Sequence, residues 1–242
     1  MITRSEFLTS LLAALGTAGT ASAEPAYDQA RRAMVSNIDQ LLAAGAAPGL
    51  RRLSPAVRAV LLEVPRHLFV PEVHRGRAHG DSALPIGHDA TISQPLMVAA
   101  MTDLLELAPE HRVLEVGTGS GYQAAVLSKL AREVFSIEIV EPLARSADAR
   151  LQALGYRATV RAGDGYKGWP EHAPFDRIMV TAGASHVPAP LVAQLRPGGR
   201  MLIPMGPDSR RQQLTLVTRD ARGRTYTRRL FPVHFIPLQE SR

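Results

Sequence analysis

Residues Arg112-Val-Leu-Glu-Val-Gly-Thr-Gly-Ser-Gly121 join a short apolar run to three alternating glycines. The apolar run predicts a buried strand, and the pattern of residues 123–131 predicts a helix after it. Glycines in a tight strand-to-helix turn let the backbone approach a ligand closely, although a purely structural turn explains many such loops. The stretch therefore predicts strand, turn and helix, with the turn as the candidate ligand-binding element.

Strand-like and helix-like runs alternate through this half of the chain. The strand-like runs are residues 112–116, 134–138, 158–161, 177–180 and 200–203, and helical patterns cover residues 123–131, 142–154 and 189–195. This alternation predicts right-handed βαβ units on a parallel sheet. Residues 214–218 and 226–230 flank a turn at residues 220–224 and predict an antiparallel hairpin.

The chain before residue 111 has a different texture. Ile38, Leu41 and Leu42 fall at helical spacing, and Ser54-Pro55 places an N-cap and a first-turn proline before another helical pattern. Residues 27–70 are therefore predicted to be helical. Residues 71–95 are rich in glycine, proline, histidine and aspartate and show no period, so we expect a long loop, either functional or disordered.

Together these patterns predict an α/β fold. We expect a Rossmann-like, doubly wound, mostly parallel sheet with an N-terminal helical cap and a C-terminal antiparallel hairpin. Residues 24–110 form the helices and loop, residues 111–205 the core and residues 206–242 the hairpin, all within a single domain. Because ligands bind at the carboxyl ends of strands in such sheets, the glycine turn lies at the expected binding edge.

The spacing of the glycines separates two cofactors. The dinucleotide fingerprint is G-x-G-x-x-G, whereas this chain reads G-x-G-x-G, with Tyr122 where the last glycine of the fingerprint belongs. Glu115 precedes the first glycine, and a carboxylate there suits a cationic amino-acid group and repels a pyrophosphate. The turn therefore favours S-adenosylmethionine, which carries an ammonium and a sulfonium, over NAD.

Two further acids follow neighbouring strands. Glu138 closes the second strand, where a carboxylate accepts both ribose hydroxyls, and Asp164 follows the third strand, where it accepts from an adenine amino group. The alternative for each is a helix cap or turn residue. We assign cofactor binding to Glu115, Gly117, Thr118, Gly119, Gly121, Glu138, Asp164 and Gly165.

Segments on both sides of the turn carry a family resemblance. They are Val64-Pro-Arg-His-Leu-Phe-Val-Pro71, Leu84-Pro-Ile-Gly87, Thr91-Ile-Ser-Gln-Pro95, Val113-Leu-Glu-Val-Gly-Thr-Gly-Ser-Gly-Tyr122, Val180-Thr-Ala182, Gln194-Leu-Arg-Pro-Gly-Gly199 and Phe235-Ile-Pro-Leu238. With these motifs the chain resembles the protein-L-isoaspartate O-methyltransferase family over about residues 33–238. The Thr-Ile-Ser-x-Pro segment and the closing Phe-x-Pro-Leu are the most specific of them.

The resemblance implies a repair enzyme and a single methyltransferase domain. Members of the family methylate the free α-carboxylate of isoaspartyl residues in damaged proteins with S-adenosylmethionine. The ester then cyclises to a succinimide, which hydrolyses partly to aspartate. A carboxylate with a pKa of about 4 is already ionised at neutral pH, so the reaction needs no general base, nucleophilic residue or metal. Two alternatives stay open: a methyltransferase acting on another carboxylate, and a protein that binds the cofactor without turnover.

The resemblance also implies the substrate site. Ser93 matches the family's active-site serine, and we expect its hydroxyl to orient the isoaspartyl carboxylate. The alternative is an N-cap for the helix predicted over residues 96–105. The residues expected to line the same pocket are Thr91, Ile92, Val180 and Thr181.

The chain departs from the family pattern in the loop expected to cover the substrate. His79 stands where the family usually has tyrosine, and Asp89-Ala90 stands where it commonly has Gly-Gln. These departures bear on substrate preference more than on methyl transfer. His79 and His88 are candidates for pH-sensitive binding, but we favour surface histidines without a role.

Composition limits the other possibilities. The chain has no cysteine, and its histidines show no metal-ligand spacing, so we expect no metal. The net charge of +6 and a concentration of arginine between residues 210 and 229 raise nucleic acid as a partner. No ladder of aromatic residues accompanies the arginines, so we expect a solvated surface, no nucleic-acid partner and a monomer.

Residues 1–23 have the layout of an export leader. Arg4 precedes an apolar run over residues 7–15, and Ala21-Ser22-Ala23 offers small residues for cleavage. The run is too short for a permanent membrane anchor. The family resemblance implies the cytoplasm and the leader implies the periplasm, so the compartment stays open, with the leader favouring export.

Overall fold

The centre of the protein is a seven-stranded sheet in the order β5-β4-β3-β6-β7-β8-β9. The structure is a computed structural model that describes the backbone of residues 4–240 and the side chains of residues 24–240. The parallel strands are β3 (Arg112–Val116), β4 (Glu133–Glu138), β5 (Thr159–Ala162), β6 (Phe175–Val180) and β7 (Leu195–Met205). Strands β8 (Gln212–Arg219) and β9 (Thr225–Val233) continue the sheet in antiparallel pairing.

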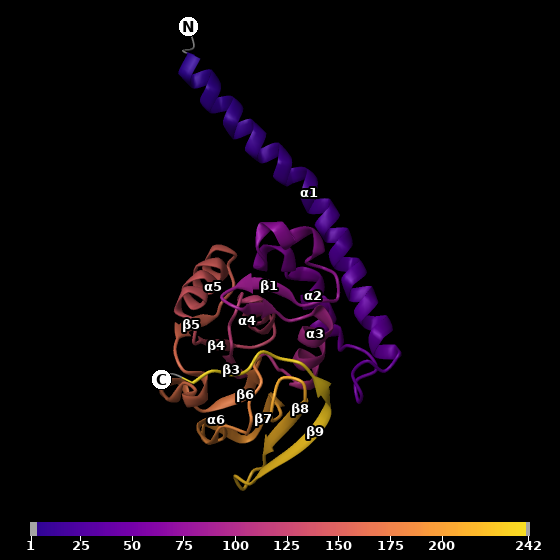
Figure 1. Ribbon diagram of the computed structural model, residues 1–242, viewed down its shortest axis with the longest axis vertical. Coiled ribbons are helices and arrows are strands. Elements are labelled where there is room, and N and C mark those ends of the chain that lie inside the picture. The colour runs from indigo at the N-terminus through magenta and orange to yellow at the C-terminus, as the bar shows by residue number, and fades with distance from the viewer. Residues whose placement is uncertain (1–3, 241–242) are drawn as a thin grey trace.

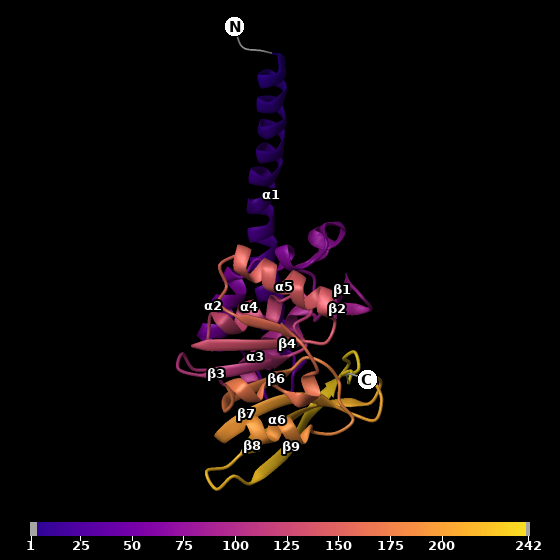
Figure 2. The same ribbon diagram turned by 90° about the vertical axis from the view of Figure 1, so that its left-hand side faces the viewer.

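Helices cover both faces of this sheet (Figure 2). On one face lie α1 (Arg4–Ala43), α2 (Pro55–Glu63), α3 (Pro95–Leu104), α4 (Tyr122–Ser128) and α5 (Glu141–Ala153), and on the other lies α6 (Ala189–Gln194). Along β3, Val113 packs in the cluster under the first group of helices, and Leu114 packs in the cluster on the opposite face. Because both faces are buried, the strands read as nearly continuous apolar runs.

The predicted strands and helices are present with small changes of length. The run at residues 112–116 coincides with β3, and the predicted hairpin forms β8 and β9 at the edge of the main sheet. Strand β7 begins at Leu195, within the segment predicted as the end of a helix. The predicted α/β fold with a mostly parallel sheet is confirmed.

The N-terminal helices pack through apolar side chains. Ile38 and Leu42 of α1 are fully buried in the cluster that also holds residues of α2 and α3. The predicted cap of α2 is confirmed, because the backbone N–H of Val57 donates to the Ser54 hydroxyl at 3.4 Å. The first part of α1 extends beyond the rest of the chain (Figure 1).

Residues 71–95 contain regular structure, so the prediction of a plain loop is wrong. They form a 3-10 helix, η2 (Glu72–Arg77), and an antiparallel hairpin of β1 (Leu84–Gly87) and β2 (Ala90–Ile92). These strands are too short for alternation to be recognised in the sequence. Their turn is made by His88 (φ 53°) and Asp89 (φ 55°) without a glycine at either position.

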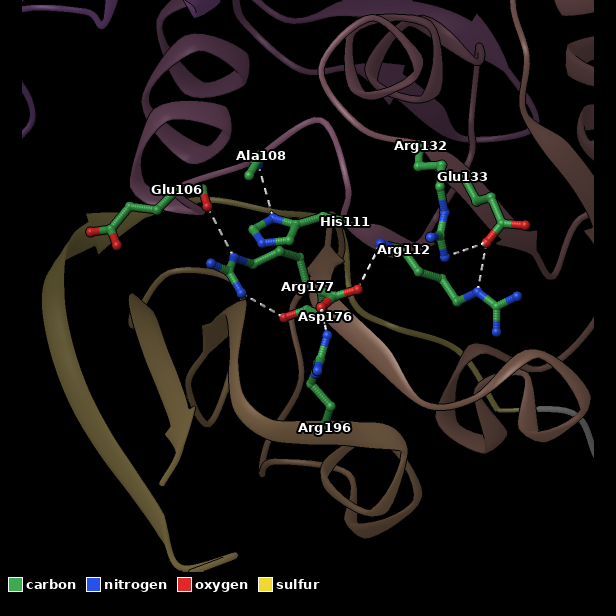
Figure 3. A network of polar contacts seen from close by, with 9 residues as sticks. All are labelled: Glu106, Ala108, His111, Arg112, Arg132, Glu133, Asp176, Arg177 and Arg196. Carbon is green, nitrogen blue, oxygen red and sulfur yellow. Dashed lines mark hydrogen bonds and ion pairs between the residues drawn. The ribbon is translucent and has the colours of Figure 1, made fainter. Parts of the chain in front are cut away.

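A polar network joins the amino ends of the parallel strands (Figure 3). The Asp176 carboxylate of β6 accepts from the backbone N–H of Arg112 in β3 at 2.8 Å and pairs with Arg196 of β7. Arg177 donates to the carbonyl of Leu105, after α3, at 2.8 Å. These contacts tie the strands together at their amino ends, and the carboxyl ends of the strands lie on the other side of the sheet's centre.

The predicted leader falls outside the fully described part of the chain. Residues 1–3 are not described, and only the backbone of residues 4–23 is described, within α1. The leader therefore stays a prediction. Within the described residues, no helix combines the length and apolar character needed to cross a bilayer.

Candidate functional site

Two cavities lie at the carboxyl ends of the parallel strands. The larger has a volume of about 660 Å³ and the smaller about 350 Å³, and both volumes include space that is open to solvent. The larger is lined by His88, Asp89, Ala90, Thr91, Val116, Gly117, Gly119, Ile137, Glu138, Ile139, Val140, Gly165, Thr181, Ala182, Ile236, Pro237, Leu238 and Gln239. The smaller is lined by Thr91, Ile92, Ser93, Val98, Gly117, Thr118, Gly119, Ser120, Tyr122, Gln123 and Thr181.

The two cavities meet at a shared wall. Thr91, Gly117, Gly119 and Thr181 line both of them. The two cavities therefore lie next to each other on either side of the glycine turn. A ligand that fills both places its middle beside these residues.

Only glycine fits at Gly117. Its φ is +101°, and a Cβ there would lie 2.5 Å from the Thr181 hydroxyl. That hydroxyl lies 2.6 Å from the carbonyl oxygen of Gly117 and 2.9 Å from that of Val116, so its hydrogen is shared between two acceptors. Thr181 thus fixes the turn from the end of β6.

Glu138 holds the other side of the turn. Its Oε2 accepts from the backbone N–H of Gly119 at 2.8 Å, and its Oε1 accepts from the backbone N–H of Val140 at 2.9 Å. A carboxylate has about four acceptor sites, so each oxygen keeps one. Glu138 lines the larger cavity, where the remaining acceptors suit a pair of ligand hydroxyls.

Glu115 lies behind the turn and lines neither cavity. Its side chain is fully buried, and its Oε2 accepts from the Ser136 hydroxyl at 2.5 Å. The Thr118 hydroxyl lies 2.5 Å from the same Ser136 hydroxyl, so a polar chain connects Glu115 to the turn. Burial, with a smaller contribution from the charge of Glu138, raises the pKa of Glu115 to about 8, against the effect of the Ser136 bond.

One oxygen of Glu115 has no partner. Among the described residues no group donates to its buried Oε1. A buried acceptor without a donor is uncommon and is often satisfied by a ligand or water. An ammonium group is such a donor, so the residue still fits the cationic end of the expected cofactor.

Asp164 and Gly121 support the site from behind. The backbone N–H of Tyr166 donates to Asp164 at 2.9 Å, which makes Asp164 the cap of the 3-10 helix η3 (Gly165–Lys167). Gly121 has a φ of +85°, and a Cβ there would lie 3.3 Å from Leu151 of α5. Neither residue lines a cavity, whereas Gly165 does, and a side chain on Gly165 would collide with Val116.

The predicted substrate residues are partly brought together. Ser93 and Ile92 line the smaller cavity, and Thr91 and Thr181 line both. Val180, at the end of β6, is buried in the apolar cluster on the face that α6 covers, and it lines neither cavity. The N-cap of α3 is Gln94, so the alternative that made Ser93 this cap is wrong. The Ser93 hydroxyl makes no hydrogen bond to the residues that the structure describes.

The residues that depart from the family pattern lie in two different places, one in the interior and one at the larger cavity. His79 is only 8% exposed and lies beside His67 and Tyr27, so the expectation of a surface histidine is wrong for it. Burial, followed by the charges of neighbouring groups, lowers the pKa of His79 to about 4. His88 and Asp89 line the larger cavity. Asp89 has a φ of 55°, a backbone conformation that glycine adopts more readily than aspartate.

The C-terminal segment is the part of the wall that the sequence did not assign. After β9 the chain runs back across the sheet (yellow in Figure 1). The backbone N–H of Leu238 donates to Gly183 at 2.7 Å, and the side chain of Gln212 bonds both backbone groups of Phe235. The Phe235-Ile-Pro-Leu238 motif was therefore the available indication of this wall.

No side-chain cluster suited to a metal accompanies these cavities. Within the side chains that the structure describes, no group of three or more His, Asp or Glu residues is placed to hold a metal ion.

Comparison with known proteins gives a consistent result. The family model of protein-L-isoaspartate(D-aspartate) O-methyltransferase matches residues 39–242. Protein-L-isoaspartate O-methyltransferase 2 of Syntrophobacter fumaroxidans is 51% identical over 96% of this chain and 95% of its own length. Protein-L-isoaspartate O-methyltransferase 1 of Cupriavidus necator is 52% identical over 90% of this chain and 85% of its own.

Solved structures agree with these relatives. A protein-L-isoaspartate O-methyltransferase structure superposes with a TM-score of 0.71 at 29% identity, covering 84% of this chain and 65% of that one. A structure from Plasmodium falciparum, described as a putative protein-L-isoaspartate O-methyltransferase in complex with S-adenosyl-L-homocysteine, also has a TM-score of 0.71. It is 26% identical and covers 86% of this chain and 98% of its own.

Proposed function

The chain belongs to the protein-L-isoaspartate(D-aspartate) O-methyltransferase family, and we propose that its two adjacent cavities are the place where it carries out the family's reaction. It transfers a methyl group from S-adenosylmethionine to the free α-carboxylate of L-isoaspartyl residues in damaged proteins, which starts repair through a succinimide. The observation that supports this location is the shared wall of Thr91, Gly117, Gly119 and Thr181, with Glu138 in one cavity and Ser93 in the other.

The larger cavity fits the nucleoside part of the cofactor. Glu138 has free acceptor sites for the ribose hydroxyls, and Val116, Ile137 and Gly165 line the same cavity, where a flat ring can pack against them. Asp164 caps η3 with one oxygen, and its other oxygen lies 3.6 Å from the Lys167 ammonium. We retain Asp164 as the proposed adenine contact because it adjoins Gly165, which lines the cavity. When bound, the cofactor supplies a methyl group activated by a positively charged sulfur.

The glycine turn and Glu115 hold the amino-acid part. The open backbone of Gly117 and Gly119 forms the shared wall, and Thr118 connects that wall to Glu115 through Ser136. Because the pKa of Glu115 is about 8, its carboxyl is mostly protonated at pH 7. We propose that the positive charge of a bound ammonium lowers this pKa, so that Glu115 releases its proton to water. The residue then provides a buried negative charge for the cation.

The acceptor side needs orientation rather than activation. The isoaspartyl carboxylate is already ionised at neutral pH, so no residue has to remove a proton. We propose that the Ser93 hydroxyl donates to one carboxylate oxygen and leaves the other free to attack the methyl carbon. Thr91 and Ile92 form the adjoining wall. Alignment of this kind lowers a barrier by up to roughly 7–11 kcal/mol.

The hairpin and the C-terminal segment exclude water from the reacting groups. Ile86, in β1, approaches the glycine turn so closely that a Cβ on Gly119 would lie 3.4 Å from its side chain. Pro237 and Leu238 line the larger cavity from the C-terminal segment, where Pro237 pairs with Gly183, just after β6. We propose that a peptide substrate enters beside His88 and Asp89, at the turn of the hairpin.

The test is methylation of a synthetic peptide with labelled S-adenosylmethionine. The isoaspartyl peptide should gain base-labile label much faster than the aspartyl peptide of the same sequence. Equal rates would mean that the acceptor is another carboxylate, and cofactor binding without any transfer would leave a binding protein. The Ser93→Ala variant should keep its affinity for S-adenosylhomocysteine and lose most activity, whereas unchanged kinetics would remove Ser93 from the mechanism.

Three expectations about the whole chain also stand as proposals. Residues 24–242 form one methyltransferase domain, which is supported by the shared apolar cluster of α1 with the helices of the core. The protein acts as a monomer, and it has no nucleic-acid partner. Light scattering and a filter-binding assay with labelled RNA and DNA test the latter two.

A further inference from the structure

Arg66 is a fully buried arginine next to the substrate segment. It lies in the 3-10 helix η1 (Arg66–Phe69), and its side chain has no exposed surface. Its Nε donates to the carbonyl of Ala78 at 2.7 Å, and one terminal nitrogen donates to the carbonyl of Ser93, also at 2.7 Å. Hydrogen bonds from a charged donor are among the stronger ones in proteins. One guanidinium thus connects two distant points of the segment between η2 and α3.

The guanidinium also touches the cofactor side of the site. Its central carbon lies 5.0 Å from the ring centroid of Tyr122, the first residue of α4, directly after the glycine turn. Tyr122 lines the smaller cavity together with Ser93. Arg66 therefore lies between the residue that follows the cofactor turn and the backbone of the proposed substrate serine.

Burial lowers the pKa of Arg66 only to about 10, so the side chain keeps its charge at neutral pH. No carboxylate forms an ion pair with it among the described residues. Keeping a charged group in such a place is costly unless its donors are well used. The two carbonyl bonds and the ring of Tyr122 offset part of this cost, while the buried Nη1 has no hydrogen-bond partner among the described residues.

A second contact fixes the other side of Ser93. Asp81 accepts from the backbone N–H of Leu96 at 2.8 Å, at the beginning of α3. The backbone is thus held at Ser93 itself by Arg66 and three residues later, in the first turn of α3, by Asp81. Both bonds act on the backbone, so they fix the place from which the Ser93 side chain projects.

We propose that Arg66 is a positioning residue for methyl transfer, which holds the backbone of Ser93 at a fixed place relative to the glycine turn. The inference rests on the proposed role of Ser93. Arg66 itself touches neither cavity, so it acts through Ser93. A lysine has no planar fork and cannot hold two carbonyls in the same geometry.

The experiment compares Arg66→Lys with a matched control, Arg177→Lys. Arg177 likewise donates only to backbone carbonyls, from Nε to Leu105 at 2.8 Å and Glu106 at 3.1 Å and from Nη1 to Asp176 at 2.9 Å, but it lies at the amino ends of the strands. For each variant we would measure kcat and KM with an isoaspartyl peptide, Kd for S-adenosylhomocysteine, and Tm. All kinetics are recorded well below the lowest Tm.

We expect Arg66→Lys to lower kcat by about 100-fold, because a misplacement of roughly 1 Å costs about that much. Its Kd for S-adenosylhomocysteine should change by less than about threefold, worth under about 0.7 kcal/mol. Arg177→Lys should lower Tm and leave kcat unchanged. A kcat near the wild-type value for Arg66→Lys, or a parallel loss of cofactor affinity, would overturn the proposal.

A double variant separates this inference from the role of Ser93. If Arg66 acts through Ser93, Arg66→Lys should remove little activity once Ser93→Ala is present. Full loss in both backgrounds would make Arg66 merely structural. Wild-type activity in Ser93→Ala alone would instead remove the premise. Should Arg66→Lys fail to fold, Arg66→Gln keeps two donors without the charge and must show the same separation of kcat from Kd.

Discussion

Replacing Glu138 by alanine should weaken cofactor binding far more than it weakens the fold. The carboxylate accepts from the backbone N–H groups of Gly119 and Val140 at 2.8 and 2.9 Å, which leaves two acceptor sites for a ligand in the cavity. Two hydrogen bonds from ribose hydroxyls to a charged acceptor are worth about 1.5–3 kcal/mol each. Their loss predicts about 3–6 kcal/mol, a rise in Kd of roughly 10²–10⁴-fold.

The assay is isothermal titration of S-adenosylhomocysteine, with Tm recorded for each protein. An analogue lacking the 2′-hydroxyl isolates the proposed contact, since Glu138→Ala should weaken its binding much less than that of the parent ligand. The matched variant Glu138→Gln keeps one acceptor toward the turn, so its Kd should lie between those of the wild type and Glu138→Ala. Equal losses for both ligands, or an unchanged Kd, would refute the reasoning from acceptor sites.

Three further predictions concern stability. Glu115 has a pKa of about 8 in the folded protein and 4.5 ordinarily, so between these pH values the folded protein binds one proton more than the unfolded chain. The free energy of unfolding therefore falls as pH rises through that window. Glu115→Gln should remove most of this fall, on the order of 4 kcal/mol, in thermal unfolding without cofactor, and equal pH dependence of wild type and variant would contradict the prediction. Gly117→Ala should lower Tm and cofactor affinity, whereas Gly198→Ala, which shares a positive φ but meets no neighbour, should lower Tm only slightly. Asp89→Gly should raise stability by about 0.5–1 kcal/mol in urea unfolding, and no gain would mean that Asp89 is unstrained.

The main sheet was predictable because its strands are buried on both faces. Apolar runs bounded by turns indicated β3 and β4 within one residue, and Ser54-Pro55 indicated the start of α2. The β1–β2 hairpin was missed because its strands have only four and three residues, and its turn uses His88 and Asp89 rather than glycine.

The site was predictable in its residues more than in their orientation. Glu115 is an acid beside a glycine turn, but in a strand it shares the face of Val113, two positions earlier, and therefore points into the packing with the helices. The alternation of side chains along a strand thus indicates the buried orientation of Glu115 from the sequence itself. The buried position of Arg66 was not predictable, because its carbonyl partners lie in segments without regular pattern.

The most direct test of the central claim follows the substrate itself by mass spectrometry during turnover. An L-isoaspartyl peptide should gain a single methyl group, which fragmentation places on the α-carboxyl of the isoaspartyl residue. The ester should then lose methanol and give the succinimide, while the matched aspartyl peptide stays unmodified. Methyl transfer to any other position, or an isoaspartyl peptide that stays unmodified while bound cofactor is consumed on another acceptor, would contradict the account.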